Sequence, residues 1–145
     1  MKFQYTVASD GKGGPLLDSR CKWVKRPIIR LELKDKDGNH FEAPAVIDSG
    51  ADTTTLNIQY ADLLGIALDK KNPHKIMGVG SGEVEVFQGV FPFVIKDMGI
   101  KLEVPAWYVD SNHVNILLGQ EVFFDSFRIK FEKDHDTFEV SPCKS

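Results

Sequence analysis

The sequence predicts a single, mostly β domain with one or two short helices, and three observations lead to this fold class. Apolar and polar residues alternate over several stretches of the chain, as they do in half-buried strands. Clusters of turn-forming residues separate these stretches. The chain has 145 residues, of which 42% are hydrophobic, and this is enough for one hydrophobic core but not for two.

The N-terminal part differs from the rest in its pattern. Residues 3–7 alternate in hydrophobicity and predict a strand that pairs elsewhere in the fold. Residues 9–20 are rich in turn formers and predict a loop. We therefore expect residues 1–22 to be an N-terminal extension, either a strand or a flexible loop, and residues 23–145 to form the domain itself.

The domain is predicted to begin with a hairpin formed by residues 27–33 and 41–47, because both segments alternate and an aspartate–glycine turn lies between them. A short helix is predicted over residues 57–64, where Asn57 can cap the start and Gly65 can end it. Further strands are predicted within residues 75–102 and over 104–109, 114–118, 127–131 and 137–140, with helical turns over 119–125.

Composition and charge argue against several classes of function. The formal net charge of −3 argues against a nucleic-acid partner. No segment reaches the roughly 20 apolar residues that span a bilayer, and the N-terminus lacks the apolar region of a signal peptide. We therefore expect a cytoplasmic protein with no membrane partner. Cys21 and Cys143 are too few and too far apart for a disulfide scaffold or zinc site, and the histidines lack metal-ligand spacing. We expect neither metal nor cofactor.

The stretch from Ala45 to Thr53 carries the most information about function. Three apolar residues lead directly into Asp48, so a strand is predicted to deliver a carboxylate to its end. Ser49 and Gly50 then turn the chain, and the glycine leaves room for close backbone approach. Because Asp, Ser and Gly are also common in plain turns, this triplet predicts a functional site only in combination with other motifs.

Two later segments supply such motifs, and together the three resemble the retroviral-type (retropepsin-like) single-lobed aspartic proteases. Residues 48–53 resemble the active-site motif of this family, residues 75–84 its glycine-rich flap, and residues 115–119 the apolar motif, ending in glycine, that packs beneath the catalytic loop. Order and spacing agree over residues 26–132. The resemblance implies a small closed acid-protease barrel with a catalytic loop at its base and a flap hairpin above it.

The resemblance also implies an activity, that of an aspartic endopeptidase whose catalytic residue is Asp48. The chain contains one Asp-Ser-Gly triplet, so the second aspartate is expected from a second copy in a homodimer. Ser49 and Gly50 are implied to support the active-site loop. An extended peptide or protein substrate is implied to contact Ala51, Asp52, Gly78, Val79 and Gly80.

Two features depart from the retroviral pattern. A basic residue commonly follows the second-motif glycine and pairs with the acidic residue of the catalytic loop, whereas Gln120 and Glu121 follow Gly119 here and leave Asp52 without that partner. Residues 127–140 predict a hairpin in place of one terminal strand, so the dimer interface is expected to differ from interleaved termini. The competing interpretation is a catalytically silent module with the same fold that binds peptides without cleaving them.

Overall fold

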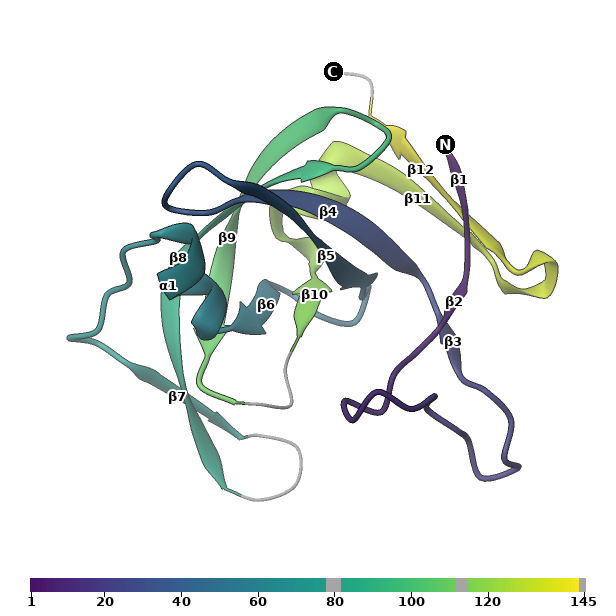
Figure 1. Ribbon diagram of the computed structural model, residues 1–145, viewed down its shortest axis with the longest axis horizontal. Helices are drawn as coiled ribbons and strands as arrows, with labels where there is room; N and C mark the ends of the chain where they lie inside the picture. Colours follow the sequence, from purple (N-terminus) through teal and green to yellow (C-terminus); the bar gives the residue numbers. More distant parts are fainter. Residues whose placement is uncertain (78–81, 112–114, 144–145) are drawn as a thin grey trace.

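The centre of the molecule is a closed barrel, seen in a computed structural model that describes residues 1–77, 82–111 and 115–143 (Figure 1). Six strands pair around it in the order β4, β5, β10, β6, β9 and β8, and a further pairing of β4 with β8 closes the ring. Their bounds are Ile28–Lys34 for β4, His40–Ile47 for β5, Ile116–Leu118 for β10, Thr54–Asn57 for β6, Ile100–Val109 for β9 and Glu83–Ile95 for β8. The predicted mostly β barrel is confirmed.

The barrel closes around side chains that alternate along each strand. In β4, Ile29, Leu31 and Leu33 are buried, and the residues between them are exposed. Strands β8 and β9 form a long hairpin that contributes aromatic residues such as Phe91 and Tyr108, both fully buried. Burial of each such side chain stabilises the fold by roughly 1.5–3 kcal/mol. The period-two pattern of the sequence therefore marks the inner face of the barrel.

Strand β7 (His74–Met77) lies outside the closed ring, since it pairs only with β8. The pairing runs antiparallel from His74↔Val86 to Met77↔Glu83, so the two strands form a hairpin that projects from the barrel (Figure 1). The hairpin predicted to contain the flap is therefore present in its two strands, while its tip falls outside the described residues.

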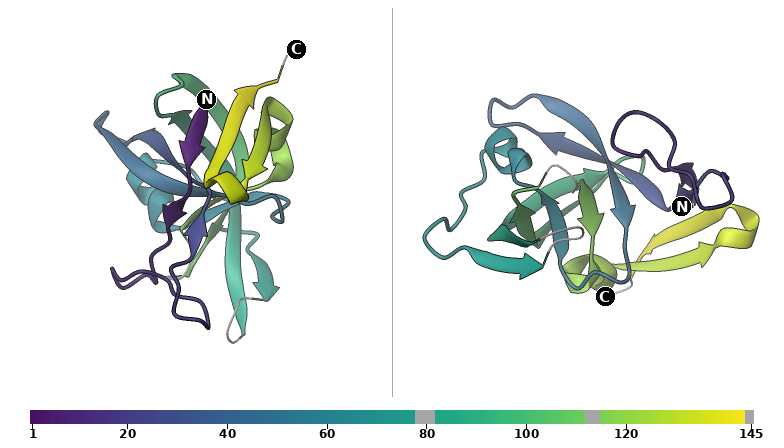
Figure 2. Two further views of the ribbon diagram at one scale, coloured as in Figure 1. Left: turned by 90° about the vertical axis from the view of Figure 1, so that its right-hand side faces the viewer. Right: turned by 90° about the horizontal axis from the view of Figure 1, so that it is seen from below.

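A second, three-stranded sheet joins the two ends of the chain, which lie side by side in Figures 1 and 2. Its central strand is β12 (Thr137–Pro142), which pairs with β1 (Lys2–Gln4) on one edge and with β11 (Phe127–Glu132) on the other. The Phe3 ring stacks on the Phe138 ring with centroids 5.4 Å apart. The hairpin predicted near the C-terminus is thus β11–β12, and the predicted N-terminal strand pairs with it.

Tyr5 anchors the N-terminal segment to this sheet. Its side chain is 9% exposed, and its ring centroid lies 5.7 Å from that of Phe138. The Lys133 ammonium lies 4.3 Å from the ring centroid, within the range of a cation–π contact. The chain then forms a short ribbon of β2 (Thr6–Val7) with β3 (Lys25–Arg26) before it enters the barrel. The division of the chain at residue 22 stays a prediction.

The predicted helix forms as α1 (Gln59–Leu64), two residues shorter than expected at its start because Asn57 belongs to β6. The Asn57 Oδ1 still accepts a hydrogen bond from the Gln59 backbone N–H at 2.9 Å. Gly65 ends the helix with a left-handed φ of 70°. The other helical turns are η1 (Gln120–Phe124) and η2 (Lys133–His135). In the described part of the chain, no helix has the length and hydrophobicity to cross a membrane.

The contacts of Tyr5 predict that the N-terminal segment contributes to stability. Tyr5→Ala should lower the free energy of unfolding by about 2–4 kcal/mol, because it removes a buried ring from Phe138 and leaves a cavity. Leu17→Ala is the matched control within the same segment, since Leu17 is 47% exposed and its loss should change stability by about 0.5 kcal/mol or less. Chemical denaturation measures both. Equal effects of the two substitutions would show that the segment is peripheral to the fold.

Candidate active site

Two parallel strands bring the segments that follow Ile47 and Leu118 to one edge of the barrel. Strand β10 pairs with β5 so that Leu118 lies opposite Ile47 at the end of both strands. The Asp48 backbone N–H continues this ladder by donating to the Leu118 carbonyl oxygen at 2.9 Å. The segments that leave the two strands, one starting at Asp48 and the other at Gly119, therefore emerge next to each other.

The Asp48 carboxylate is fixed by its own loop. Its Oδ1 accepts a hydrogen bond from the Gly50 backbone N–H at 3.0 Å, and its backbone carbonyl accepts one from Ala51 at 3.2 Å. A Cβ atom at residue 50 would lie 3.3 Å from Asp48 Oδ1, which is a tight contact. Glycine at this position thus lets the backbone approach the carboxylate closely. Asp48 itself is half-buried, and Gly50 is exposed.

The segment after β10, residues 119–121, lies across this loop and is called the strap below. The Gln120 and Glu121 backbone N–H groups donate to the carbonyl oxygens of Ala51 and Asp52 at 2.8 and 2.9 Å. The Gly119 N–H donates at 3.2 Å to the hydroxyl of Thr54, which is fully buried. These bonds satisfy the loop carbonyls that no strand partner reaches. The loop and the strap together form one hydrogen-bonded unit.

Gly119 has no room for a side chain. A Cβ atom there would lie 2.6 Å from the Thr53 carbonyl carbon and 2.8 Å from the Ala51 carbonyl oxygen. Both atoms belong to the backbone, which cannot rotate away as a side chain can. The glycine that ends the second motif is therefore required by direct contact with the loop of the first motif.

The structure places five of the eight predicted site residues on a single loop. Asp48 is followed by Ser49, Gly50, Ala51 and Asp52, and of these only Asp48 and Ala51 are half-buried, the others being exposed. Gly78, Val79 and Gly80 fall outside the described residues. Among the ion pairs of the described residues, none includes Asp52. This agrees with the replacement of the expected basic partner by Gln120.

Sequence reasoning missed two polar contacts between the strap and the loop. The Gln120 side-chain Nε2 donates to the Ser49 carbonyl oxygen at 2.7 Å. The Thr53 hydroxyl donates to Glu121 Oε2 at 3.4 Å. The position of Gln120 directly after the second-motif glycine was the available signal, but a side chain that reaches a backbone carbonyl has no sequence pattern of its own.

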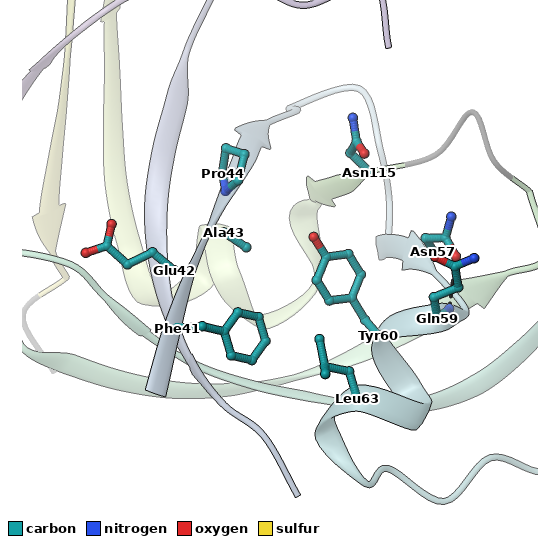
Figure 3. Close-up of a pocket in the computed structure, with 9 residues that line it drawn as sticks. All are labelled: Phe41, Glu42, Ala43, Pro44, Asn57, Gln59, Tyr60, Leu63 and Asn115. Carbon is teal, nitrogen blue, oxygen red and sulfur yellow. Dashed lines mark hydrogen bonds between the residues drawn. The ribbon is translucent and has the colours of Figure 1, made fainter. Parts of the chain in front are cut away.

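A hollow of about 350 Å³ lies elsewhere on the barrel, between β5 and α1. Phe41 and Tyr60 approach it from opposite sides in Figure 3. Burial raises the pKa of the Tyr60 phenol. Asp48 does not line this hollow, so the hollow is separate from the candidate site. Among the described residues, no group of three or more His, Cys, Asp or Glu side chains could hold a metal ion.

The close contact at Gly119 leads to a testable prediction. Gly119→Ala should destabilise the protein by about 1–3 kcal/mol, because the added methyl group forces the loop backbone to shift. Gly14→Ala is the control, since the three atoms nearest its added Cβ all belong to the exposed Asp10 side chain, the closest at 3.1 Å, and none belongs to the backbone. Thermal or chemical unfolding measures the difference. Equal stability of the two variants would contradict the contact.

Comparison with known proteins places this geometry in a family. The family described as gag-polyprotein putative aspartyl protease matches residues 37–124, which is more than half of the chain. The crystal structure of the retroviral protease-like domain of Ddi1 from Leishmania major is similar, with a TM-score of 0.54 and 14% sequence identity, over 81% of this chain and 89% of that one. A search of curated proteins finds no match. The chain belongs to the gag-polyprotein aspartyl protease family and has a retropepsin-like fold.

Proposed function

We propose that this protein is an aspartic endopeptidase that works as a homodimer, with Asp48 as its catalytic residue. The observation that supports this most directly is the placement of Asp48. It stands at the end of a barrel strand, and its Oδ1 accepts the Gly50 N–H at 3.0 Å. Membership of the aspartyl protease family supports a hydrolase. A position at a strand end, held by a rigid loop, is suited to a group that must meet a substrate in one orientation.

The proposed mechanism requires two carboxylates. The chain supplies one Asp-Ser-Gly triplet, so the second Asp48 comes from a second copy related by two-fold symmetry. Two carboxyl groups a few ångströms apart share one proton, because the repulsion between two adjacent negative charges disfavours the ionisation of both at once. The ionised group takes a proton from a water molecule as the water attacks the peptide carbonyl, and the protonated group donates to the developing oxyanion. The carboxyl group that took the water's proton then passes it to the leaving amine nitrogen as the peptide bond breaks, and no covalent intermediate forms.

Exposure of the loop supports the homodimer. Ser49 and Gly50 are exposed in the single chain, directly beside the half-buried Asp48. In the proposed dimer the Ser49 hydroxyl bonds across the interface and braces the two loops. Strand β12 already pairs with β1 and β11 of its own chain, so we propose an interface that differs from interleaved terminal strands.

We propose that the substrate binds as an extended peptide, which adds a strand to the site. Ala51 and Asp52 would contact it from the loop, and Gly78, Val79 and Gly80 from the tip of the β7–β8 hairpin. The exposed Asp52 is free of ion pairs with described residues, which leaves its carboxylate available for such a contact. A cytoplasmic location is part of this proposal.

The alternative is a peptide-binding module that has the same fold and does not cleave its ligand. It is favoured by the position of β7 at the edge of its sheet, where it pairs with β8 alone among the described strands, since such an edge can accept a peptide strand without any catalytic group. A site that holds a half-buried carboxylate in a fixed orientation favours the enzyme, because a binding module has little need for it.

Asp48→Asn should abolish peptide cleavage, lowering kcat/KM by about a thousandfold or more, because the amide cannot accept the proton of the attacking water. The fold should persist, since the amide oxygen can still accept the Gly50 N–H. Asp62→Asn is the matched control, because Asp62 is an exposed residue of α1. A peptide-library assay between about pH 4 and 7 provides the measurement.

The cleavage rate of the parent protein, plotted against pH in the same assay, should follow a bell-shaped curve with its optimum at roughly pH 4–6.5, because both groups that titrate in the proposed mechanism are carboxyl groups.

A hydroxyl-containing peptide analogue separates the two functions. It should bind the parent tightly inside the active pH range and lose affinity in Asp48→Asn, because its hydroxyl takes the place of the attacking water. Tight binding that depends on neither pH nor Asp48, without any cleavage, would identify a binding module.

The homodimer predicts that specific activity depends on protein concentration. Activity per milligram should rise as the total concentration passes the dimer dissociation constant, because a monomer contains only half of the proposed site. A dilution series of the cleavage assay, run beside analytical ultracentrifugation, measures this. Constant specific activity at concentrations where the protein sediments as a monomer would refute the shared site.

A further inference from the structure

We propose that Gln120 is a positioning residue for Asp48 and acts through the peptide group that joins Ser49 to Gly50. This inference rests on the proposed function, since it assigns Gln120 a part in orienting the catalytic carboxylate. Neither the family match nor the sequence pattern points to this role, because a basic residue is expected directly after the second-motif glycine.

The geometry consists of two hydrogen bonds to the same peptide group. The Gln120 Nε2 donates to the Ser49 carbonyl oxygen at 2.7 Å. The N–H of that same peptide unit, which belongs to Gly50, donates to Asp48 Oδ1 at 3.0 Å. A peptide group is planar and trans, so its C=O and N–H point in opposite directions. Fixing the oxygen at one end therefore fixes the direction of the N–H at the other.

Gln120 is itself held firmly at its backbone. Its N–H donates to the Ala51 carbonyl oxygen at 2.8 Å, and the preceding Gly119 lies so close to the Thr53 backbone that no side chain would fit between them. The side chain therefore starts from a fixed point and reaches the carbonyl from outside the loop. The series of contacts runs from the strap, through the peptide group, to the carboxylate.

The chemistry of the amide suits this role. An amide NH₂ group donates to a carbonyl oxygen and carries no charge, so it holds the loop without neutralising the carboxylates of Asp48 and Asp52. Hydrogen bonds at the two ends of one peptide group also polarise it, and each strengthens the other. A carboxylate in place of the amide would repel the Ser49 oxygen, whereas an ammonium group could still donate to it.

Three substitutions at this position separate the donor from the bulk of the side chain. Gln120→Met keeps the length and removes the donor, Gln120→Glu replaces the donor by a titratable group, and Gln120→Lys restores a donor. Gln59→Met is the matched control, because Gln59 is an exposed glutamine on α1. The measurements are kcat and KM per active dimer, the midpoint of thermal unfolding, the dimer dissociation constant, and hydrogen exchange at the Gly50 amide by NMR.

Gln120→Met should lower kcat by roughly 10- to 100-fold, because a misplaced catalytic group costs rate, while KM changes by about threefold or less. Gly50 amide exchange should become at least about fivefold faster than in Gln59→Met, as a lost local hydrogen bond allows local opening. The unfolding midpoint and the dimer dissociation constant should stay near those of the parent. Gln120→Lys should recover part of kcat, because its ammonium group can donate to the Ser49 oxygen although it also adds a charge near Asp52.

The pH dependence of Gln120→Glu gives a readout that a purely structural role would not change. Below about pH 4 the introduced carboxyl group is protonated and can donate to the Ser49 oxygen, and above that range it is ionised and cannot. The ratio of its kcat to that of Gln120→Met should therefore exceed one in acid and fall as the pH rises. Asp48, Asp52 and Glu121 are present in both variants, so their own effects cancel in this ratio.

Failure of this inference is distinguishable from failure of the proposed function. If Asp48→Asn abolishes cleavage but Gln120→Met keeps kcat within about threefold, the inference is wrong and the protease assignment stands. A loss of kcat matched by a lower unfolding midpoint or weaker dimer, with no rescue by Gln120→Lys, would also overturn it. If the parent cleaves no peptide, the Gly50 amide exchange decides alone, and unchanged exchange in Gln120→Met refutes the contact.

Discussion

The parallel pairing of β5 with β10 is the constraint on which the rest of the candidate site depends. It places Ile47 opposite Leu118, so the loop that starts at Asp48 and the segment that starts at Gly119 leave the barrel at the same level. The carbonyl groups of Ser49, Ala51 and Asp52 then find their hydrogen-bond donors in that segment. A one-residue shift in this register would turn every side chain of β10 to the opposite face and separate the two segments.

The way the chain ends are joined limits how a second copy can approach. Strand β12 has β1 on one edge and β11 on the other, and a strand with both edges paired accepts no further strand. A second copy that extended this sheet would therefore add at the free edge of β1 or of β11. Phe3, Tyr5 and Phe138 pack together at the β1 side, which ties the N-terminal strand to the same sheet.

The loop that starts at Asp48 combines a hydrogen-bonded backbone with exposed side chains. Its carbonyl groups are held by hydrogen bonds from the strap, one of them from the uncharged Gln120 side chain, while Ser49 and Asp52 remain exposed. A hydrogen bond from an uncharged side chain is insensitive to ionic strength. An ion pair between exposed groups, in contrast, is weakened by salt because dissolved ions screen its charges. The amide of Gln120 thus holds the loop without adding a positive charge, and among the described residues no ion pair includes Asp52.

The sequence by itself determined the fold class, most of the strands, though not β6, and the position of Asp48 at a strand end. Alternation and turn residues are local signals, so they can be recognised without knowing which strands pair with each other. The end of the helix was predicted from an equally local signal, the glycine at position 65. Only the tertiary structure decided which strands are neighbours in the barrel, that β12 lies between β1 and β11, and that Gln120 reaches Ser49, 71 positions away. Such contacts depend on the closure of the barrel and the register of its strands, and no local pattern encodes either one.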